Sequence, residues 1–383
     1  MILQPFRTMQ FVVCFFVAVT TTSESSFPQD ANSNRPGSQR PIENVVLITL
    51  DGLRGEEVFT GADKRLISKE SGVKNVDTCV SQYWRDDPVE RRRVLMPSLW
   101  DRIENHGGWI AGNSEEESLV RVTNGLFFSY PGYNEILSGF ADPWVNSNDK
   151  RYNKNTTVLE WLHQQGGLQG RISAYTSWDV FPFIINDQRS KIPVNAGWMP
   201  LAVGSKEKTE TANFIASQLF HEFDGVRYDA ITTVGALEEI KTNKPRVLFV
   251  SLGETDDWAH AGRYDLYLLT AQQNDRFLAE IWETTQAIEQ YKDKTLFIVT
   301  TDHGRGDGRE GWKNHSVLLA GSERIWVAAW GVPLYVSGID HGGKFTQSQV
   351  APTIAAALGH NFKSTNPKIA NPLPIIPEVA EKP

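Results

Sequence analysis

Three apolar runs in this chain are each followed closely by acidic or histidine side chains, and this pattern constrains the fold most. The runs and the residues that follow them are Asn44–Leu50 with Asp51, Val247–Leu252 with Asp256, and Thr295–Thr301 with Asp302 and His303. Short runs this apolar are typical of buried parallel strands. Because ligands bind beyond the carboxyl ends of such strands, we expect these side chains to meet at one sheet edge.

Helical patterns alternate with the apolar runs. They cover residues 94–108, with Pro97 near the start and Gly107 and Gly108 at the end, and then residues 267–291 and 350–358. A fourth run, Val332–Val336, also reads as a strand. Strands that alternate with helices predict an α/β layered domain with a mainly parallel central sheet flanked by helices.

Composition narrows the class of protein. The chain has 383 residues and a net charge of −8, without a long basic run. This length accommodates one large α/β domain or two ordinary ones. The acidic balance argues against a nucleic-acid polymer as partner, although metals could still attract phosphoryl groups locally.

The N-terminus resembles a secretory signal, with Arg7 before the short apolar run 11–19. That run is about half the ~20 residues that a membrane span needs, so we expect a secreted or periplasmic protein without a stable span after cleavage. An uncleaved anchor is the alternative. The expected organisation is a signal peptide at 1–23, a flexible linker at 24–41, a catalytic domain at 42–362 and a Pro-rich tail at 363–383.

The polar residues after the runs form a candidate metal-ligand set. Asp256 and His260 are four residues apart, which places both on one helical face. Asp302 and His303 are adjacent and precede Gly304, and His315 follows a Gly-rich loop. Each residue alone could be a helix cap or a loop residue. Mixed nitrogen and oxygen donors suit zinc, while manganese or iron could also bind.

Ser129 is the candidate nucleophile. It lies in the segment Phe128-Ser-Tyr-Pro-Gly-Tyr-Asn-Glu-Ile-Leu-Ser-Gly139, where a turn into a helix would expose its hydroxyl. No Gly-x-Ser-x-Gly motif surrounds it. Activation by a metal, which lowers the pKa of a coordinated hydroxyl, is therefore the expected chemistry.

These motifs together resemble the alkaline phosphatase superfamily, and especially its type I phosphodiesterase/nucleotide pyrophosphatase branch. The resemblance covers residues 44–360 and implies two divalent metals, a phosphoserine intermediate and a small phosphate ester as substrate. It implies one metal at Asp51, Ser129, Asp302 and His303, and the other at Asp256, His260 and His315. Residues 140–245 are rich in aromatics, which either line the substrate pocket or serve ordinary core and surface packing.

The chain departs from that branch at two positions. Gly132 and Lys150 stand where the branch carries Asn. Candidates for the missing phosphate contacts are Asn146, Asn148, Lys150, Arg263 and Lys313. An exported phosphodiesterase or phosphatase is the leading interpretation. A phosphomutase of the same fold and a non-catalytic metal-binding protein remain alternatives, and a sulfatase is disfavoured because Tyr133 replaces the Arg that sulfatases need.

Overall fold

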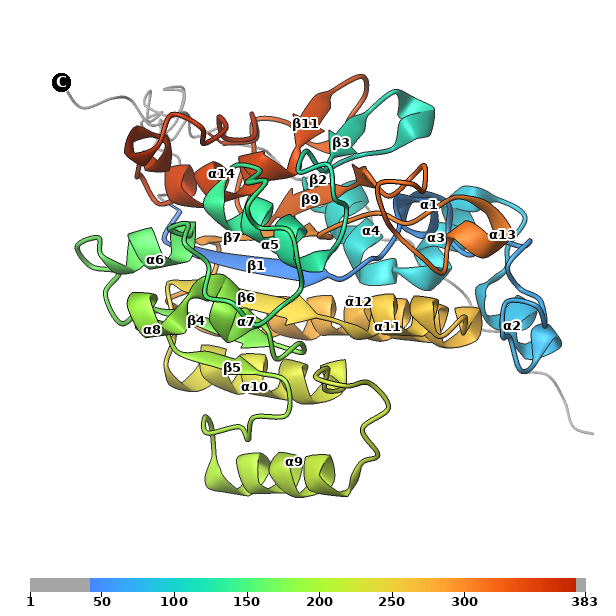
Figure 1. Ribbon diagram of the computed structural model, residues 1–383, viewed down its shortest axis with the longest axis horizontal. Helices are drawn as coiled ribbons and strands as arrows, with labels where there is room; N and C mark the ends of the chain where they lie inside the picture. Colours follow the sequence, from blue (N-terminus) through green and yellow to red (C-terminus); the bar gives the residue numbers. More distant parts are fainter. Residues whose placement is uncertain (1–41, 377–383) are drawn as a thin grey trace, which may run out of the picture. The chain divides into compact units, whose positions relative to one another are not determined.

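The computed structural model describes residues 42–376, so the predicted signal peptide and linker lie outside the described part. A central eight-stranded sheet organises these residues (Figure 1). Its strands, in order across the sheet, are β10 (Gly338–Ile339), β2 (Trp109–Ala111), β9 (Val327–Trp330), β7 (Thr295–Thr300), β1 (Asn44–Leu50), β6 (Val247–Leu252), β4 (Ile172–Thr176) and β5 (Val194–Ala196). Among these strands only β9 runs antiparallel to its neighbours, which confirms a mainly parallel sheet.

Register places the predicted ligands at one edge. Thr49 of β1 pairs with Ser251 of β6 on one side and with Thr300 of β7 on the other. The three strands therefore end at the same level. Asp51 and the Asp302–His303 pair follow directly, and α11 (Glu254–His260) begins just past β6.

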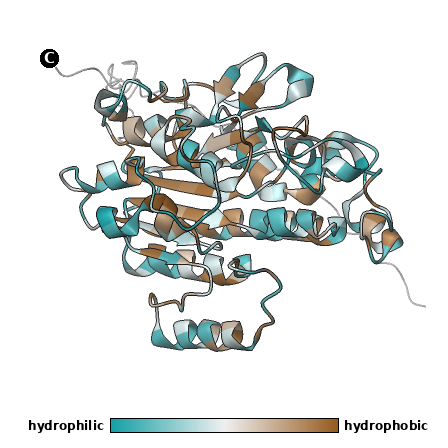
Figure 2. Cartoon of the chain, viewed as in Figure 1, coloured by the Kyte–Doolittle hydropathy of each residue, from teal (hydrophilic) through white to brown (hydrophobic). Residues whose placement is uncertain are grey.

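Helices cover both faces of the sheet. Side chains of β1 alternate between two cores: Val46, Ile48 and Leu50 belong to one, and Val45 and Leu47 to the other, as the pleat requires. Figure 2 shows hydrophobic residues along β1. The first core includes α3 (Pro88–Leu95), α4 (Pro97–Asn105), α10 (Asp229–Thr242) and α12 (Tyr264–Gln286), and the second includes α5 (Ser129–Ser138), α6 (Val158–His163), α7 (Phe181–Ile185) and α14 (Val350–Ala357).

The remaining elements surround this core. A three-stranded sheet consists of β11 (Lys344–Thr346), β3 (Leu119–Arg121) and β8 (Arg324–Ile325). The other helices are α1 (Gly55–Thr60), α2 (Val76–Tyr83), α8 (Asp187–Ser190), α9 (Lys206–Gln218) and α13 (Gly308–Gly311), with short 3-10 turns η1 (Ser114–Glu116), η2 (Gln347–Gln349) and η3 (Phe362–Thr365). Among the described residues, no helix combines the length and the apolar character that a membrane crossing requires.

The predicted strand at Val332–Val336 is wrong. These residues form bends and irregular chain, and the strand lies earlier, at β9. Gly331 has φ of 101°, and a Cβ there would come within 2.3 Å of the Thr295 carbonyl oxygen, so the chain turns away from the sheet. Pro333 follows and lacks the N–H that a ladder needs.

The C-terminal Pro-rich segment contributes to the core. Ile369, Leu373, Ile375 and Ile376 are buried in the same core cluster as α14. Extended chain beyond residue 362 therefore still buries apolar side chains in this core.

Candidate metal centre

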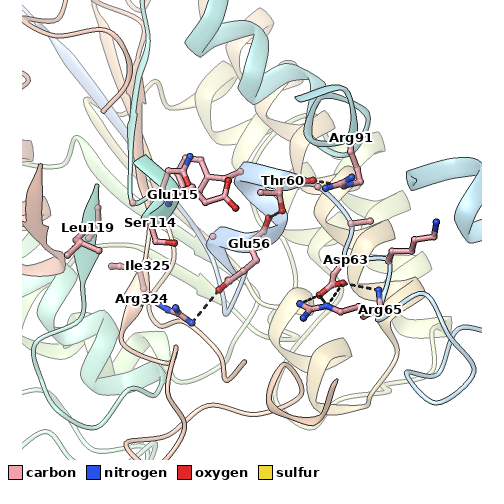
Figure 3. A pocket seen from close by; sticks show the side chains of 18 of the residues that line it. Glu56, Thr60, Asp63, Arg65, Arg91, Ser114, Glu115, Leu119, Arg324 and Ile325 are labelled. Carbon is pink, nitrogen blue, oxygen red and sulfur yellow. Dashed lines mark hydrogen bonds and ion pairs between the residues drawn. The ribbon is translucent and has the colours of Figure 1, made fainter. Parts of the chain in front are cut away.

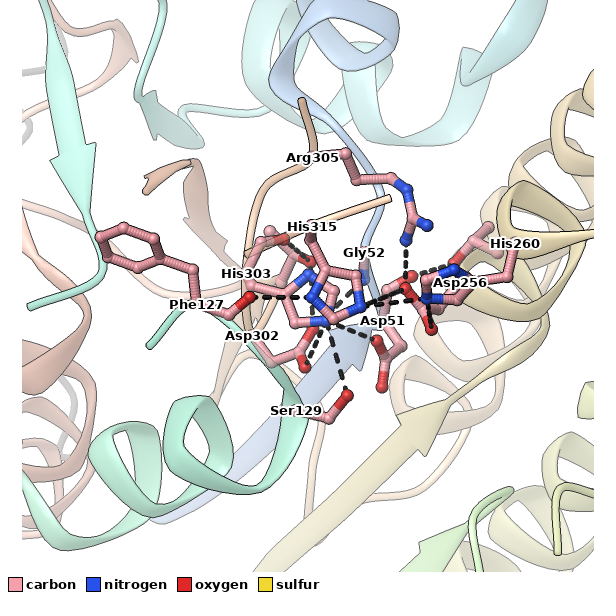
Figure 4. Close-up of polar contacts among 12 residues, drawn as sticks. Asp51, Gly52, Phe127, Ser129, Asp256, His260, Asp302, His303, Arg305 and His315 are labelled. Atoms are coloured by element: carbon pink, nitrogen blue, oxygen red, sulfur yellow. Dashed lines mark hydrogen bonds and ion pairs between the residues drawn. The ribbon is translucent and has the colours of Figure 1, made fainter. Parts of the chain in front are cut away.

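Ser129 is the first residue of α5. Phe128 before it is extended (φ −144°, ψ 171°), so the helical conformation begins at Ser129 itself. Ser129 is only 7% exposed, and its Oγ lies 3.5 Å from Nε2 of His303 (Figure 4). A helix N-terminus carries partial positive charge, which favours negative charge on a nearby oxygen. The predicted nucleophile thus lies in a setting that suits an alkoxide.

Three of the predicted ligands surround this serine. One donor atom each from Asp51, Asp302 and His303 lie within 4.8 Å of one another. His303 Nε2 is 3.5 Å from Asp51 Oδ1 and 3.4 Å from Asp302 Oδ2. Asp51 Oδ1 and Asp302 Oδ2 are buried without a hydrogen-bond partner. Buried polar atoms without partners are costly, so two such oxygens beside an imidazole nitrogen fit a metal site.

A second group of predicted ligands adjoins the first. Donor atoms of Asp256, His303 and His315 also lie within 4.8 Å of one another. His260 Nε2 lies 3.2 Å from Asp256 Oδ2 and 3.0 Å from His315 Nε2. The structure therefore brings all seven predicted ligands together, from α5, from α11 and from the segments that follow β1 and β7.

Backbone carbonyl groups orient two of the imidazoles. His303 Nδ1 is 2.9 Å from the Gly304 carbonyl oxygen, and His315 Nδ1 is 2.8 Å from that of Phe127. A carbonyl oxygen only accepts, so each Nδ1 carries the proton. Each Nε2 is then left with its lone pair toward the centre, which is the tautomer that a metal requires.

Electrostatics at the centre favour a cation. Burial raises the pKa of Asp302 to about 7, and the nearby Asp256 adds to the effect. Burial, with Asp302 and Asp256 next in importance, also raises the pKa of Asp51 well above its usual range. Burial lowers the pKa of His315 to about 4 and that of His303 well below its usual range. Neutral imidazoles beside crowded carboxylates are the donors that divalent metals bind.

Arg305 is a residue of the centre that the sequence reasoning missed. Its guanidinium is buried and pairs with Asp256, while Nε and Nη2 donate to the carbonyl oxygens of Trp312 (2.6 Å) and Lys313 (2.7 Å). Burial acts to raise the pKa of Asp256, but Arg305 and the imidazoles outweigh it and hold that pKa well below its usual range. Its position two residues after His303 was the only signal in the sequence.

The candidate substrate-binding residues are placed differently from one another. Asn148 contacts the residue next to the nucleophile: its Oδ1 accepts from the Tyr130 N–H at 3.0 Å. Lys150 forms an ion pair with Asp179 (2.6 Å), and Arg263 forms one with Asp265 (2.9 Å). Asn146 is exposed.

A separate cavity lies beside α1. Its volume is about 430 Å³, and Figure 3 shows Glu56, Asp63, Arg91 and Arg324 among its lining side chains. None of the predicted ligands lines it. The chemistry expected from the sequence therefore belongs to the centre in Figure 4.

Comparison with solved structures identifies the fold. The crystal structure of the alkaline phosphatase PafA superimposes with a TM-score of 0.58 at 11% identity, covering 89% of this chain and 100% of that chain. The chain has the fold of the alkaline phosphatase superfamily. A PafA variant gives a TM-score of 0.54 at 12% identity, over 85% of this chain and 97% of that one. The alkaline phosphatase-like layered fold predicted from the sequence is thus confirmed.

Sequence comparison finds relatives among longer proteins. The chain is 24% identical to GPI ethanolamine phosphate transferase 1 of Gibberella zeae over 334 residues and to that of Aspergillus fumigatus over 341 residues. The matches cover 83% and 85% of this chain but 28% and 27% of the relatives, so the chain spans little more than a quarter of their length. No family model matches the chain.

Proposed function

We propose that this chain is a two-metal phosphoester enzyme with Ser129 as nucleophile, and that it hydrolyses a small phosphate ester. The observation that carries the proposal is the position of Ser129 Oγ at 3.5 Å from His303 Nε2, beside two carboxylate oxygens without partners. One divalent metal is assigned to Asp51, Ser129, Asp302 and His303, and the other to Asp256, His260 and His315. Their nitrogen and oxygen donors favour zinc over manganese or iron.

The metals would lower the pKa of the serine hydroxyl and offset charge on the phosphoryl oxygens. Ser129 Oγ forms a bond to phosphorus as the bond to the leaving-group oxygen breaks, which yields a phosphoserine. Water then cleaves that ester, releasing phosphate or a phosphate monoester and restoring the serine. The Asn148 side chain, whose Oδ1 accepts from the Tyr130 N–H at the start of α5, would have its amide N–H groups available to donate to a phosphoryl oxygen.

Transfer to an alcohol is the second candidate activity. The two named relatives are transferases of ethanolamine phosphate, and the same phosphoserine would serve if a hydroxyl group replaced water in the second step. A phosphodiester donor would then be required, because the transferred group keeps one ester bond.

The test compares p-nitrophenyl phosphate with bis(p-nitrophenyl) phosphate, with zinc, in the wild type and in Ser129→Ala. Ser138→Ala is the matched control, because its hydroxyl lies on the same helix and donates to the Asn134 carbonyl oxygen instead. We expect Ser129→Ala to lose turnover by at least about 10³-fold and Ser138→Ala to keep it. Full turnover by Ser129→Ala would exclude the covalent mechanism.

Acid quenching followed by mass spectrometry detects the phosphoserine directly. Adding ethanolamine or glycerol as an acceptor then separates the two activities. A phosphorylated alcohol as product supports transfer, whereas free phosphate or monoester alone supports hydrolysis. An isomerised sugar phosphate would indicate a phosphomutase.

We further propose export, to the periplasm or the exterior, from the signal-like segment before residue 24. Sequencing the N-terminus of the protein recovered from cells tests this. A start near residue 24 supports cleavage, and an intact Met1 in the cytoplasm contradicts it.

A further inference from the structure

Glu135 is a buried carboxylate on α5 that binds the segment leading to the nucleophile. Its two oxygens accept from the Thr123 N–H (3.0 Å), the Thr123 hydroxyl (2.7 Å) and the Asn124 N–H (3.1 Å). They also accept from the Asn124 side-chain amide (3.3 Å) and the Ser348 hydroxyl (2.7 Å). Glu135 therefore holds the 123–128 segment against the helix that Ser129 begins.

The Asn124 side chain in turn fixes the backbone of the next residues. Its Oδ1 accepts from the N–H groups of Leu126 (2.9 Å) and Phe127 (3.0 Å), so the side chain closes a local turn. Phe127 has φ of 58°, a conformation that bulky residues rarely adopt unless their surroundings impose it. Its ring packs against the second core. The Asn124 turn and that packing together impose the conformation.

This conformation directs the Phe127 carbonyl at His315. The oxygen lies 2.8 Å from His315 Nδ1, and Figure 4 shows it pointing at the imidazole while the Phe127 ring points away. Two residues later the same segment carries Ser129. The position of a metal ligand and the position of the nucleophile thus depend on one stretch of backbone.

We propose that Glu135 and Asn124 are positioning residues that fix the tautomer of His315 through the Phe127 carbonyl. The inference rests on the proposed function only in assigning a metal to His315. Loss of the Asn124 turn would free Phe127 to leave its left-handed conformation and would withdraw the acceptor from Nδ1. His315 would then exchange between tautomers, and part of the population would present a protonated Nε2 to the metal.

The experiment uses Asn124→Ala, with Asn75→Ala as the matched control. The Asn75 side chain caps α2 by accepting from the Thr78 N–H at 3.0 Å, so both variants lose the same kind of hydrogen bond. Zinc affinity is measured by competition with a chromophoric chelator. The tautomer of His315 is read from ¹⁵N–¹H correlation spectra of the zinc-free protein, with His315→Gln providing the assignment.

We expect the wild type and Asn75→Ala to show a single Nδ1–H tautomer at His315. In Asn124→Ala we expect mixed tautomers and zinc binding weakened about 10- to 100-fold, as for other partners of metal-bound histidines. Asn124→Ser, whose hydroxyl can close a similar turn, should restore part of both.

A single Nδ1–H tautomer in Asn124→Ala, with unchanged zinc affinity, would overturn the inference. Absence of zinc binding by the wild type would instead contradict the proposed function, and the zinc-free spectra would still decide the inference. Thermal melts show whether Asn124→Ala is folded under the conditions of both measurements. If that variant unfolds, Asn124→Ser tests the same turn instead.

Discussion

The hydroxyl of Tyr133 donates a hydrogen bond to Oδ2 of Asp51 at 2.8 Å, in the interior of the protein. Tyr133 lies four residues after Ser129, so both side chains project from the same face of α5. One turn of this helix therefore presents the candidate nucleophile and orients a candidate metal ligand.

Tyr133→Phe should weaken the centre more than the fold. The variant leaves Asp51 Oδ2 without its hydrogen-bond donor. We expect the free energy of unfolding to fall by about 2 kcal/mol and the affinity for zinc to fall about 10-fold or more. Tyr130→Phe is the control, since that hydroxyl donates to the Arg151 carbonyl oxygen (2.5 Å). Denaturant melts and zinc titrations measure both. Equal zinc affinities in the two variants would contradict a role for Tyr133 in orienting Asp51.

Gly132→Ala should separate α5 from the segment after β7. A Cβ at this position would lie 2.4 Å from the Asp302 carbonyl oxygen, so backbone must shift. We expect a loss of about 2 kcal/mol in stability together with weaker zinc binding. Gly166→Ala has open space around its Cβ and should stay within about 0.5 kcal/mol of the wild type.

Arg305→Met should destabilise the zinc-free protein more than the zinc-bound protein. It removes the buried partner of Asp256 and the donors to the Trp312 and Lys313 carbonyl oxygens, and breaking a buried pair costs about 3 kcal/mol or more. Saturating zinc should recover part of this loss, because a metal would compensate the Asp256 charge. Arg65→Met, which breaks an exposed pair with Asp63, should cost less than about 1 kcal/mol. Equal losses with and without zinc would argue against metal binding at Asp256.

Asp275→Asn should alter how stability depends on pH. Burial raises the pKa of Asp275 to about 6, although the N–H groups of Ser98 and Leu99 donate to it at 2.8 Å each. A carboxyl whose pKa is raised on folding contributes stability that is complete below its unfolded pKa, near 4, and is lost as pH rises to about 6. The variant cannot titrate there. Urea melts at several pH values should therefore show a shallower decline between pH 4 and 6 than the wild type shows, and an unchanged slope would refute the shift.

Zinc binding should release protons below neutral pH. The pKa of Asp302 is about 7, so at pH 6 most of this carboxyl carries a proton that a metal must displace. The raised pKa of Asp51 acts in the same direction. The pKa of His315, about 4, leaves that imidazole neutral, so it releases none. Calorimetry in two buffers of different ionisation enthalpy should show about one proton or more released at pH 6 and fewer released at pH 9, where Asp302 is already ionised. No buffer dependence at pH 6 would contradict these protonation states.

Much of the fold and of the ligand set could be predicted because both leave local patterns. The predicted runs 44–50 and 247–252 coincide with β1 and β6, since buried parallel strands require continuous apolar residues. The i, i+4 spacing of Asp256 and His260 places both on α11. The strand predicted at residues 332–336 was wrong because its apolar pattern begins after Gly331, where the chain leaves the sheet. Gly331 packs against the carbonyl oxygen of Thr295, which lies 36 residues earlier and leaves no local signal.

The sequence by itself determined which side chains follow which strands, because strand and helix periodicity depend on neighbouring residues. Only the tertiary structure decided how those side chains are held. The Phe127 carbonyl meets His315 across 188 residues, and the Tyr133 hydroxyl meets Asp51 across 82. Neither partner shows a motif, because a carbonyl group exists at every residue and a tyrosine hydroxyl becomes a donor to Asp51 only after the sheet and α5 have packed.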